Sequence, residues 1–217
     1  MATTRLAAAR SQFEARIDAA EDFVARCVSA RHNAQNRPAL TRDLLEWSAE
    51  MALLKLVLGG ERFFEIAMAL YVLGERSPTG FRPRRLRRLV ENTTVREVRD
   101  VFRGDQEHIG WNSPSVIIDR AKRWVRAGEP FQTTLSSASQ LLVYLVKMRN
   151  VVAHESESAF DKYERATRSL YGALPNRLCP GAQLIAAPPA AIPFLATGSL
   201  LGAAIASYRV IAAGIVP

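Results

Sequence analysis

Cysteine and histidine are scarce in this sequence, which limits the chemistry that it can support. Its two cysteines, Cys27 and Cys179, lie far apart, and neither has a cysteine or histidine neighbour at the spacing of metal ligands. The sequence therefore predicts neither a zinc site nor a disulfide framework, which suits a reducing compartment. The first 30 residues also lack the apolar core of a signal peptide. We predict a cytoplasmic protein.

A long uninterrupted apolar segment is also missing. Residues 178–208 carry no charge, but four prolines interrupt them. A membrane span needs about 20 apolar residues, whereas residues 197–216 contain glycines and Arg209. We favour a tail that packs on the protein or forms an interface, with no membrane partner. A membrane-associated tail is the alternative.

The composition is that of an ordinary globular protein. Of the 217 residues, 48% are hydrophobic and 23% are charged, which permits a sizeable core in one domain or in one domain with an appendage. The formal net charge of +8 attracts polyanions such as nucleic acid, anionic lipid or an acidic protein. Charge alone does not choose among these partners.

Apolar residues recur at steps of three and four along most of the chain, which predicts amphipathic helices in an all-α fold. No segment alternates as a strand would. We expect helices over residues 4–31, 41–74, 115–127, 135–152 and 159–171, and short helices on both sides of residues 92–94. Thr41 and Ser115 are expected N-caps, and Gly74 is an expected C-cap. Gly59-Gly60 either kinks or divides the second helix.

The hexapeptide RNVVAH, from Arg149 to His154, places three polar side chains where an apolar helix ends. Asn150 and His154 are four residues apart and share a helix face, and the Arg149 side chain is long enough to reach the same place. The Arg–His spacing alone is a weak signal because the chain has 25 arginines. In the structural alternative, Arg149 pairs with an acid and His154 is favoured by the helix dipole.

The segment KMRNVVAHESESAFDKYERA closely resembles the signature of HEPN domains, in which an arginine and a polar residue precede a histidine. GGERFFEIAMALYVLG resembles the acidic-aromatic helix of these proteins. WNSP and CPGAQL resemble pieces of the RiboL-PSP-HEPN subgroup. The resemblance covers residues 40–185 and implies a HEPN-like antiparallel helical bundle. We expect a helical domain over residues 1–175, with its core at 40–175, and an extra Pro/Ala-rich apolar tail over 176–217.

The same resemblance implies an endoribonuclease that uses no metal or other cofactor and acts as a homodimer with a composite active site. The residue types suit this chemistry. Histidine can accept or donate a proton near neutral pH, and arginine can hold phosphate oxygens in a bidentate fork. We therefore predict Arg149 and His154 as catalytic residues, with Asn150 orienting a phosphate or the imidazole.

Further residues have two interpretations each. Glu61 and Glu65 either position Arg149 or His154, or form a solvated first turn of the acidic-aromatic helix. An arginine cluster after that helix either binds RNA or an acidic partner protein, or is a solvated surface. Its predicted binding residues are Arg84, Arg85, Arg87 and Arg88.

The remaining aromatic and histidine residues are expected to have structural or surface roles. Four aromatic residues are predicted in the core or in a dimer interface rather than as base-stacking platforms. They are Trp47, Phe63, Phe64 and Tyr71. His32 and His108 are predicted on the surface.

The sequence thus predicts an endoribonuclease that cleaves RNA through attack by the 2′-hydroxyl, as a toxin of a toxin–antitoxin or phage-defence system with a protein antitoxin as partner. The alternative is a non-catalytic HEPN dimer that binds nucleic acid, a nucleotide or a partner protein.

Overall fold

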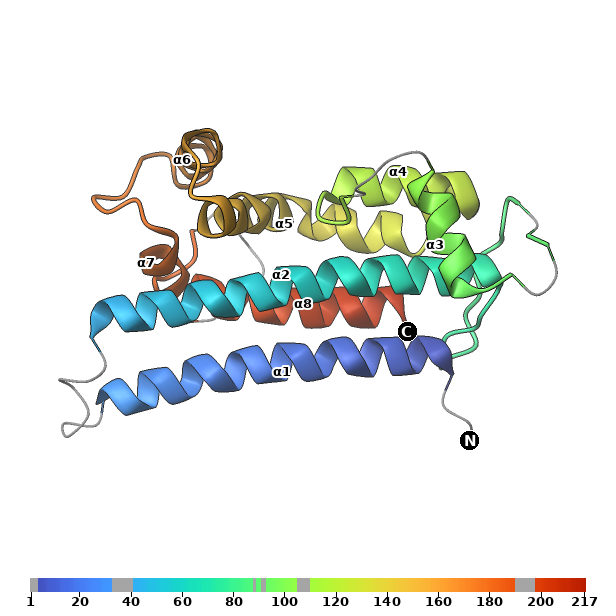
Figure 1. The fold of residues 1–217 in the computed structure, drawn as a ribbon, viewed down its shortest axis with the longest axis horizontal. Coiled ribbons are helices and arrows are strands. Elements are labelled where there is room, and N and C mark those ends of the chain that lie inside the picture. Colours follow the sequence, from blue (N-terminus) through green and yellow to red (C-terminus); the bar gives the residue numbers. More distant parts are fainter. Residues whose placement is uncertain (1–3, 33–40, 88, 91–92, 105–109, 190–197) are drawn as a thin grey trace. The chain divides into compact units, whose positions relative to one another are not determined.

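The computed structural model describes residues 4–32, 41–87, 89–90, 93–104, 110–189 and 198–217. Over these residues the chain is all-α and has no β-strand, as predicted, and it forms eight α-helices and one short 3₁₀ helix (Figure 1). The elements are α1 (Arg5–His32), α2 (Arg42–Leu73), α3 (Val95–Arg103), α4 (Pro114–Trp124), η1 (Arg126–Gly128), α5 (Phe131–His154), α6 (Glu157–Tyr171), α7 (Pro180–Ile185) and α8 (Leu200–Ile215).

The chain divides into two compact units, and the long helices contribute to both. The first unit contains residues 1–15, 59–139 and 209–217, and the second contains residues 16–58 and 140–208. The RNVVAH hexapeptide lies entirely in the second unit. The domain division predicted from the sequence, 1–175 and 176–217, stays a prediction.

Helix α2 is continuous across the two glycines that the sequence left open. Gly59 and Gly60 are both buried and helical. The helix begins where predicted, since the Thr41 hydroxyl accepts a hydrogen bond from the Leu44 N–H at 3.3 Å. It ends before Gly74, whose φ of +91° is a left-handed conformation that favours glycine. Thr41 and Gly74 are therefore confirmed as the residues at the two ends of this helix.

The first unit is built around aromatic residues of α1, α2 and α5. Phe13 and Phe63 stack with their ring centroids 4.9 Å apart. The buried Tyr71 donates a hydrogen bond from its hydroxyl to the Ile215 carbonyl at 2.6 Å, and its ring meets Phe131 edge-on. The core prediction is thus confirmed for Phe63, Phe64 and Tyr71, which are at most 3% exposed.

The start of α3 follows local sequence signals, whereas the segment before it does not. Thr94 and Glu97 form a reciprocal capping box at the first turn. The short helix expected before residues 92–94 is absent from the described part, up to Val90. There, the backbone pairs with the end of α4 instead, because the Leu86 N–H donates to the Trp124 carbonyl at 2.8 Å.

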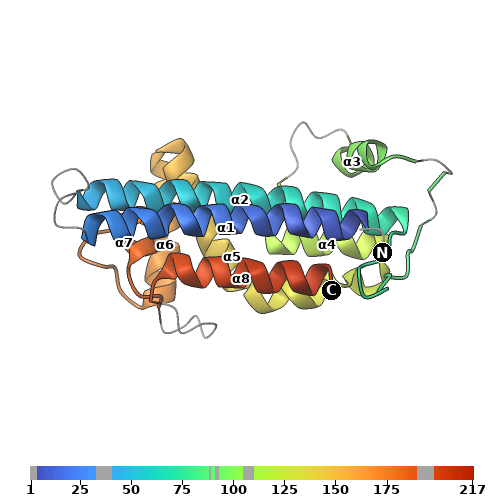
Figure 2. The same ribbon diagram turned by 90° about the horizontal axis from the view of Figure 1, so that it is seen from below.

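In the second unit, α1 and α2 run side by side in opposite directions in both views (Figures 1 and 2). Helix α5 buries Leu141, Leu145 and Met148 there, as its apolar pattern predicts. Helix α6 follows directly, and the Ser156 hydroxyl accepts a hydrogen bond from the Ala159 N–H at its first turn. In the second unit, α5 therefore ends only three residues before α6 begins.

Helices α4 and α5 begin at other residues than the sequence predicts, and one helix was not predicted. Helix α4 begins at Pro114 with Ser113 as N-cap, because proline fits the first helical position better than an interior one. Helix α5 begins at Phe131, four residues before the predicted start, since Phe131 is fully buried. Helix α7 was not predicted at all.

The tail, residues 176–217, contains α7 and a second helix, α8, which buries apolar side chains. Leu200 and Ile205 of α8 are buried in the second unit, and Ile211 and Ile215 in the first. Among the residues that the structure describes, no helix has both the length and the apolar character needed to cross a membrane.

Candidate functional site

The predicted site residues lie on the last turns of α5. Each helical residue turns by 100°, so the chain can bury one side of the helix while the other side stays accessible. Met148 faces the core, whereas Arg149 and Asn150 are half-buried and His154, the last residue of the helix, is exposed. A buried apolar helix thus ends with its polar residues at the surface, as the sequence predicted.

The structure brings Arg149 and Asn150 together. The Arg149 Nη1 donates a hydrogen bond to the Asn150 Oδ1 at 2.9 Å. The asparagine oxygen therefore helps to fix the guanidinium, and the NH₂ group of Asn150 remains as a hydrogen-bond donor. His154 lies one helical turn after Asn150. The role of His154 stays a prediction.

The two predicted supporting carboxylates lie on α2 in the first unit. Glu65 forms an ion pair with Arg99 of α3, with an N–O distance of 2.8 Å, and this hydrogen bond raises the pKa of Arg99. Glu65 is therefore engaged inside its own unit. Glu61 lies one helical turn before Glu65 on the same helix, and it is half-buried. That either residue positions Arg149 or His154 stays a prediction.

The arginine cluster has several separate local roles rather than one arrangement. Arg85 donates a hydrogen bond to the Val72 carbonyl at 3.3 Å, where it satisfies the end of α2. Arg87 lies over the Trp124 ring, 5.2 Å from its centroid. Arg84 is exposed, and Arg88 lies outside the described residues. Arg84 and Arg87 are both exposed, and their binding of RNA or of a partner protein stays a prediction.

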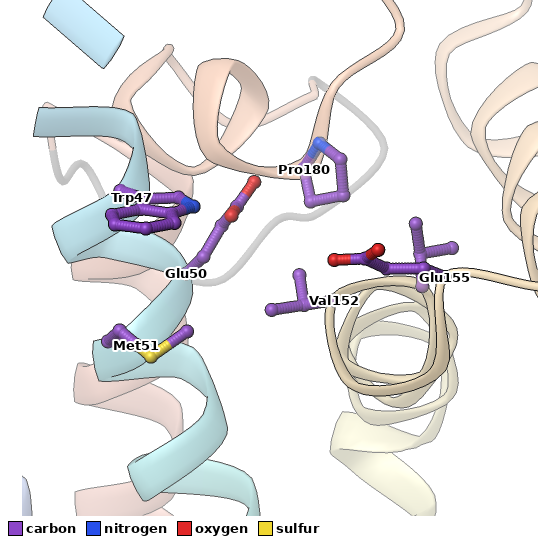
Figure 3. Close-up of a pocket in the computed structure, with 7 residues that line it drawn as sticks. Trp47, Glu50, Met51, Val152, Glu155 and Pro180 are labelled. Carbon is purple, nitrogen blue, oxygen red and sulfur yellow. The ribbon is translucent and has the colours of Figure 1, made fainter. Parts of the chain in front are cut away.

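A pocket that sequence reasoning missed lies beside the end of α5. Its volume is about 370 Å³, and α2, α5 and the first residue of α7 form its walls (Figure 3). The lining residues are Trp47, Glu50, Met51, Val151, Val152, Glu155 and Pro180. Trp47 is 67% exposed, so its predicted place in the core is wrong, and the interface alternative for it stays a prediction. One signal in the sequence was available, since Glu155 directly follows His154 and Val151 and Val152 lie within the hexapeptide.

The pocket is acidic. Figure 3 shows the Glu50 and Glu155 carboxylates on facing walls, one from α2 and one from the residue that directly follows α5. Burial raises the pKa of the Glu50 carboxyl, and the charges of Glu46 and Glu155 add to this rise. Hydrogen bonds from the Gly181 N–H and the Cys179 thiol lower the same pKa and so oppose it. Two carboxyl groups thus share one small space next to an exposed indole.

Comparison with protein-family models, curated proteins and solved structures finds no match. In the described part of the chain, histidine, cysteine, aspartate and glutamate side chains form no group of three that could hold a metal ion.

The CPGAQL segment has a clear structural role next to the pocket. The Gly181 N–H donates to the Glu50 carboxylate at 2.9 Å, and Cys179 contacts both Glu46 and Glu50 through its sulfur. Glu46 is almost fully buried and also accepts a hydrogen bond from Arg177 at 2.9 Å. Two carboxylates one turn apart on α2 thereby hold the start of α7.

The other side of α7 is held by a buried polar cluster. The Gln183 side-chain oxygen accepts hydrogen bonds from the hydroxyls of Tyr144 on α5 and Tyr163 on α6, the latter at 2.7 Å. Thr167 joins the cluster through the Tyr144 hydroxyl at 3.1 Å. Buried polar groups with such partners fix one arrangement of the helices. The end of α5, the pocket and α7 are therefore one connected structure within the second unit.

Proposed function

We propose that this chain is a metal-independent endoribonuclease of the HEPN type that acts as a toxin in a toxin–antitoxin or phage-defence system in the cytoplasm. The observation that carries the proposal is the hydrogen bond that fixes the Arg149 guanidinium on Asn150, one helical turn before the exposed His154. Arginine, asparagine and histidine then lie at one accessible helix end, where a phosphodiester can approach them.

The reaction uses a nucleophile that RNA supplies. The 2′-hydroxyl attacks the adjacent phosphorus, and the bond from phosphorus to the 5′-oxygen breaks, which leaves a 2′,3′-cyclic phosphate and a 5′-hydroxyl. His154 transfers protons as base or acid, while Arg149 stabilises the negative charge that develops on the phosphate oxygens. The Asn150 NH₂ group donates a hydrogen bond to the same phosphate.

A single chain offers only one histidine at this helix end, whereas the reaction needs both a base and an acid. We therefore propose a homodimer whose two copies of the hexapeptide face one RNA strand. The exposed arginines Arg84 and Arg87 provide positive charge for the RNA backbone or for an acidic antitoxin. The mass of the protein in solution tests the dimer directly.

A second candidate is favoured by the pocket and its exposed Trp47. A non-catalytic HEPN dimer would use the pocket to bind a nucleotide or a partner, without cleaving RNA. Expression in a bacterial host distinguishes the two candidates, because a ribonuclease toxin arrests growth and a binding module does not.

The direct test is cleavage of single-stranded and looped RNA by the purified protein in the presence of a chelator. We expect cleavage with 2′,3′-cyclic phosphate ends, and we expect Arg149→Ala to lower the rate by about 10²–10³-fold because one charged donor to the transition state is lost. Arg149→Lys keeps the charge without the bidentate fork and should restore the rate only in part. Equal cleavage by the wild type and Arg149→Ala would show that another group, or a contaminant, is responsible.

A further inference from the structure

We propose that the pocket beside the end of α5 binds a guanine base of the RNA, with Trp47 stacking on the ring and Glu155 and Glu50 accepting hydrogen bonds from its Watson–Crick edge. This inference rests on the proposed ribonuclease function and adds the base preference of the same site. It is carried by the shape of the pocket, by the hydrogen-bonding pattern of the four bases and by the backbone at Glu155.

The walls of the pocket suit a flat aromatic ring. Its volume of about 370 Å³ falls within the range of about 300–1,000 Å³ typical of small-molecule sites. Trp47 and Met51 form one apolar side on α2, and Val152 and Pro180 lie across from them (Figure 3). Proteins that recognise single-stranded RNA hold unstacked bases against such aromatic side chains.

The polar groups of the pocket select among the bases. Of the seven described residues that line it, two carry a carboxyl group and none is basic. An ionised carboxylate accepts two hydrogen bonds side by side. Guanine alone presents two neighbouring donors, N1–H and the N2 amino group, on its Watson–Crick edge, whereas adenine, cytosine and uracil each place an acceptor beside their donor. A phosphate group would be repelled by Glu50 and Glu155.

Glu155 lies at a backbone position that a glutamate rarely occupies. Its φ is +45°, in the left-handed region, and its N–H still donates to the Val151 carbonyl at 2.9 Å to close the last turn of α5. Glycine or asparagine is the usual residue at such a helix end. A strained position that directs a carboxylate into a pocket indicates a functional requirement for that carboxylate.

The two carboxyl groups have different local partners. Glu50 is held by the Gly181 N–H through one oxygen at 2.9 Å, so its position is fixed before any ligand arrives. Glu155 projects from the junction of α5 and α6 toward the opposite wall. Glu155, next to His154 in the chain, is therefore the group that accepts the N1–H and N2–H pair, while Glu50 contacts the remaining amino hydrogen.

The experiment is a titration of the full chain with free nucleosides, followed by the fluorescence of Trp47. Guanosine should quench the fluorescence to saturation, and adenosine, cytidine and uridine should bind at least about tenfold more weakly. Trp47→Ala should abolish the guanosine-dependent quenching, because the other two tryptophans of the chain do not line the pocket. Glu155→Gln, which replaces one acceptor oxygen with a donor, should weaken guanosine binding at least about tenfold.

A second variant separates a binding role from a structural one. Glu155→Gly relieves the left-handed backbone, and we expect it to raise the melting temperature by about 2–4 °C while guanosine binding is lost. A residue that only supports the helix end would not combine greater stability with lost binding. A Glu155→Gly variant that binds guanosine as tightly as the wild type would overturn the proposal.

Other occupants of the pocket give different results. Saturable binding of methylguanidinium without binding of guanosine would show a site for a basic protein side chain and would overturn the proposal. A change from dimer to monomer in Trp47→Ala, without nucleoside binding by the wild type, would place Trp47 in an interface and would also overturn it.

The pocket and the ribonuclease proposals fail separately, because nucleosides carry no phosphodiester to cleave. Guanosine binding without RNA cleavage would contradict the proposed ribonuclease function and would support guanine binding by the pocket. RNA cleavage that shows no preference for guanosine, together with no guanosine binding, would sink the pocket alone.

Discussion

Replacing His154 with alanine is expected to lower the rate of RNA cleavage by about 10²–10⁴-fold, the usual contribution of a general acid or base. His154 is the last residue of α5 and is exposed. Removing its imidazole should therefore leave the core and the melting temperature unchanged. The loss of activity would then come from the missing proton transfer rather than from unfolding. The measurement is the initial rate of cleavage of one labelled RNA, with circular dichroism melting of both proteins.

His32 offers a matched control for this variant. It is also a histidine at the last position of a helix, α1, but it has no part in the hexapeptide. His32→Ala should therefore cleave RNA at the wild-type rate. The proposed role of His154 is wrong if His154→Ala and His32→Ala retain the same activity, or if growth arrest on expression persists in His154→Ala.

Gly181→Ala is expected to be the most destabilising single-methyl change near the site. An added Cβ would lie 2.6 Å from the Glu46 carbonyl oxygen and 2.8 Å from its carbonyl carbon. These backbone atoms belong to the interior of α2 and cannot swing away as a side-chain tip would, so α7 must move. We expect a loss of about 2–3 kcal/mol in unfolding free energy, measured as a fall of roughly 4–10 °C in melting temperature.

Gly198→Ala is the control for added volume and altered backbone freedom. A Cβ at Gly198 would meet no heavy atom within 4 Å, and the residue lies in the same unit. Its melting temperature should stay close to that of the wild type. Similar melting temperatures for Gly181→Ala and Gly198→Ala would mean that α7 does not approach α2 closely.

Gly181→Ala should also weaken the pocket. The Gly181 N–H is a hydrogen-bond donor to Glu50, and the preceding Pro180 lines the pocket. A displaced α7 would release the Glu50 carboxyl, and guanosine affinity should fall together with the melting temperature. The same glycine therefore links the stability of α7 to the proposed base recognition.

Most helices follow from local sequence signals. The first turn of α3 is specified by Thr94 and Glu97, three residues apart, and the end of α2 by Gly74. Such signals act between neighbours in the chain, so they are visible without a structure. The continuous passage of α2 through Gly59 and Gly60 is not local, because both glycines are held in the helix by burial.

Helix α7 shows where local signals stop. Its six residues are too few for an apolar period to appear. The helix forms because the Glu50 carboxylate of α2 accepts the Gly181 N–H, and tyrosines of α5 and α6 donate to Gln183. These partners lie from 20 to 131 positions away in the chain, which no spacing rule detects.

Scarcity of cysteine and histidine left the sequence with one concentrated set of chemical groups, the hexapeptide at the end of α5. The sequence by itself determined that Arg149 and Asn150 would lie together at a surfacing helix end, because adjacent residues and helical periodicity are local properties. Only the tertiary structure decided that Glu155 would face Glu50 and an exposed Trp47 across a pocket. An apolar pattern specifies which face of a helix is buried, but it does not specify which distant segment will cover that face or where the cover will end.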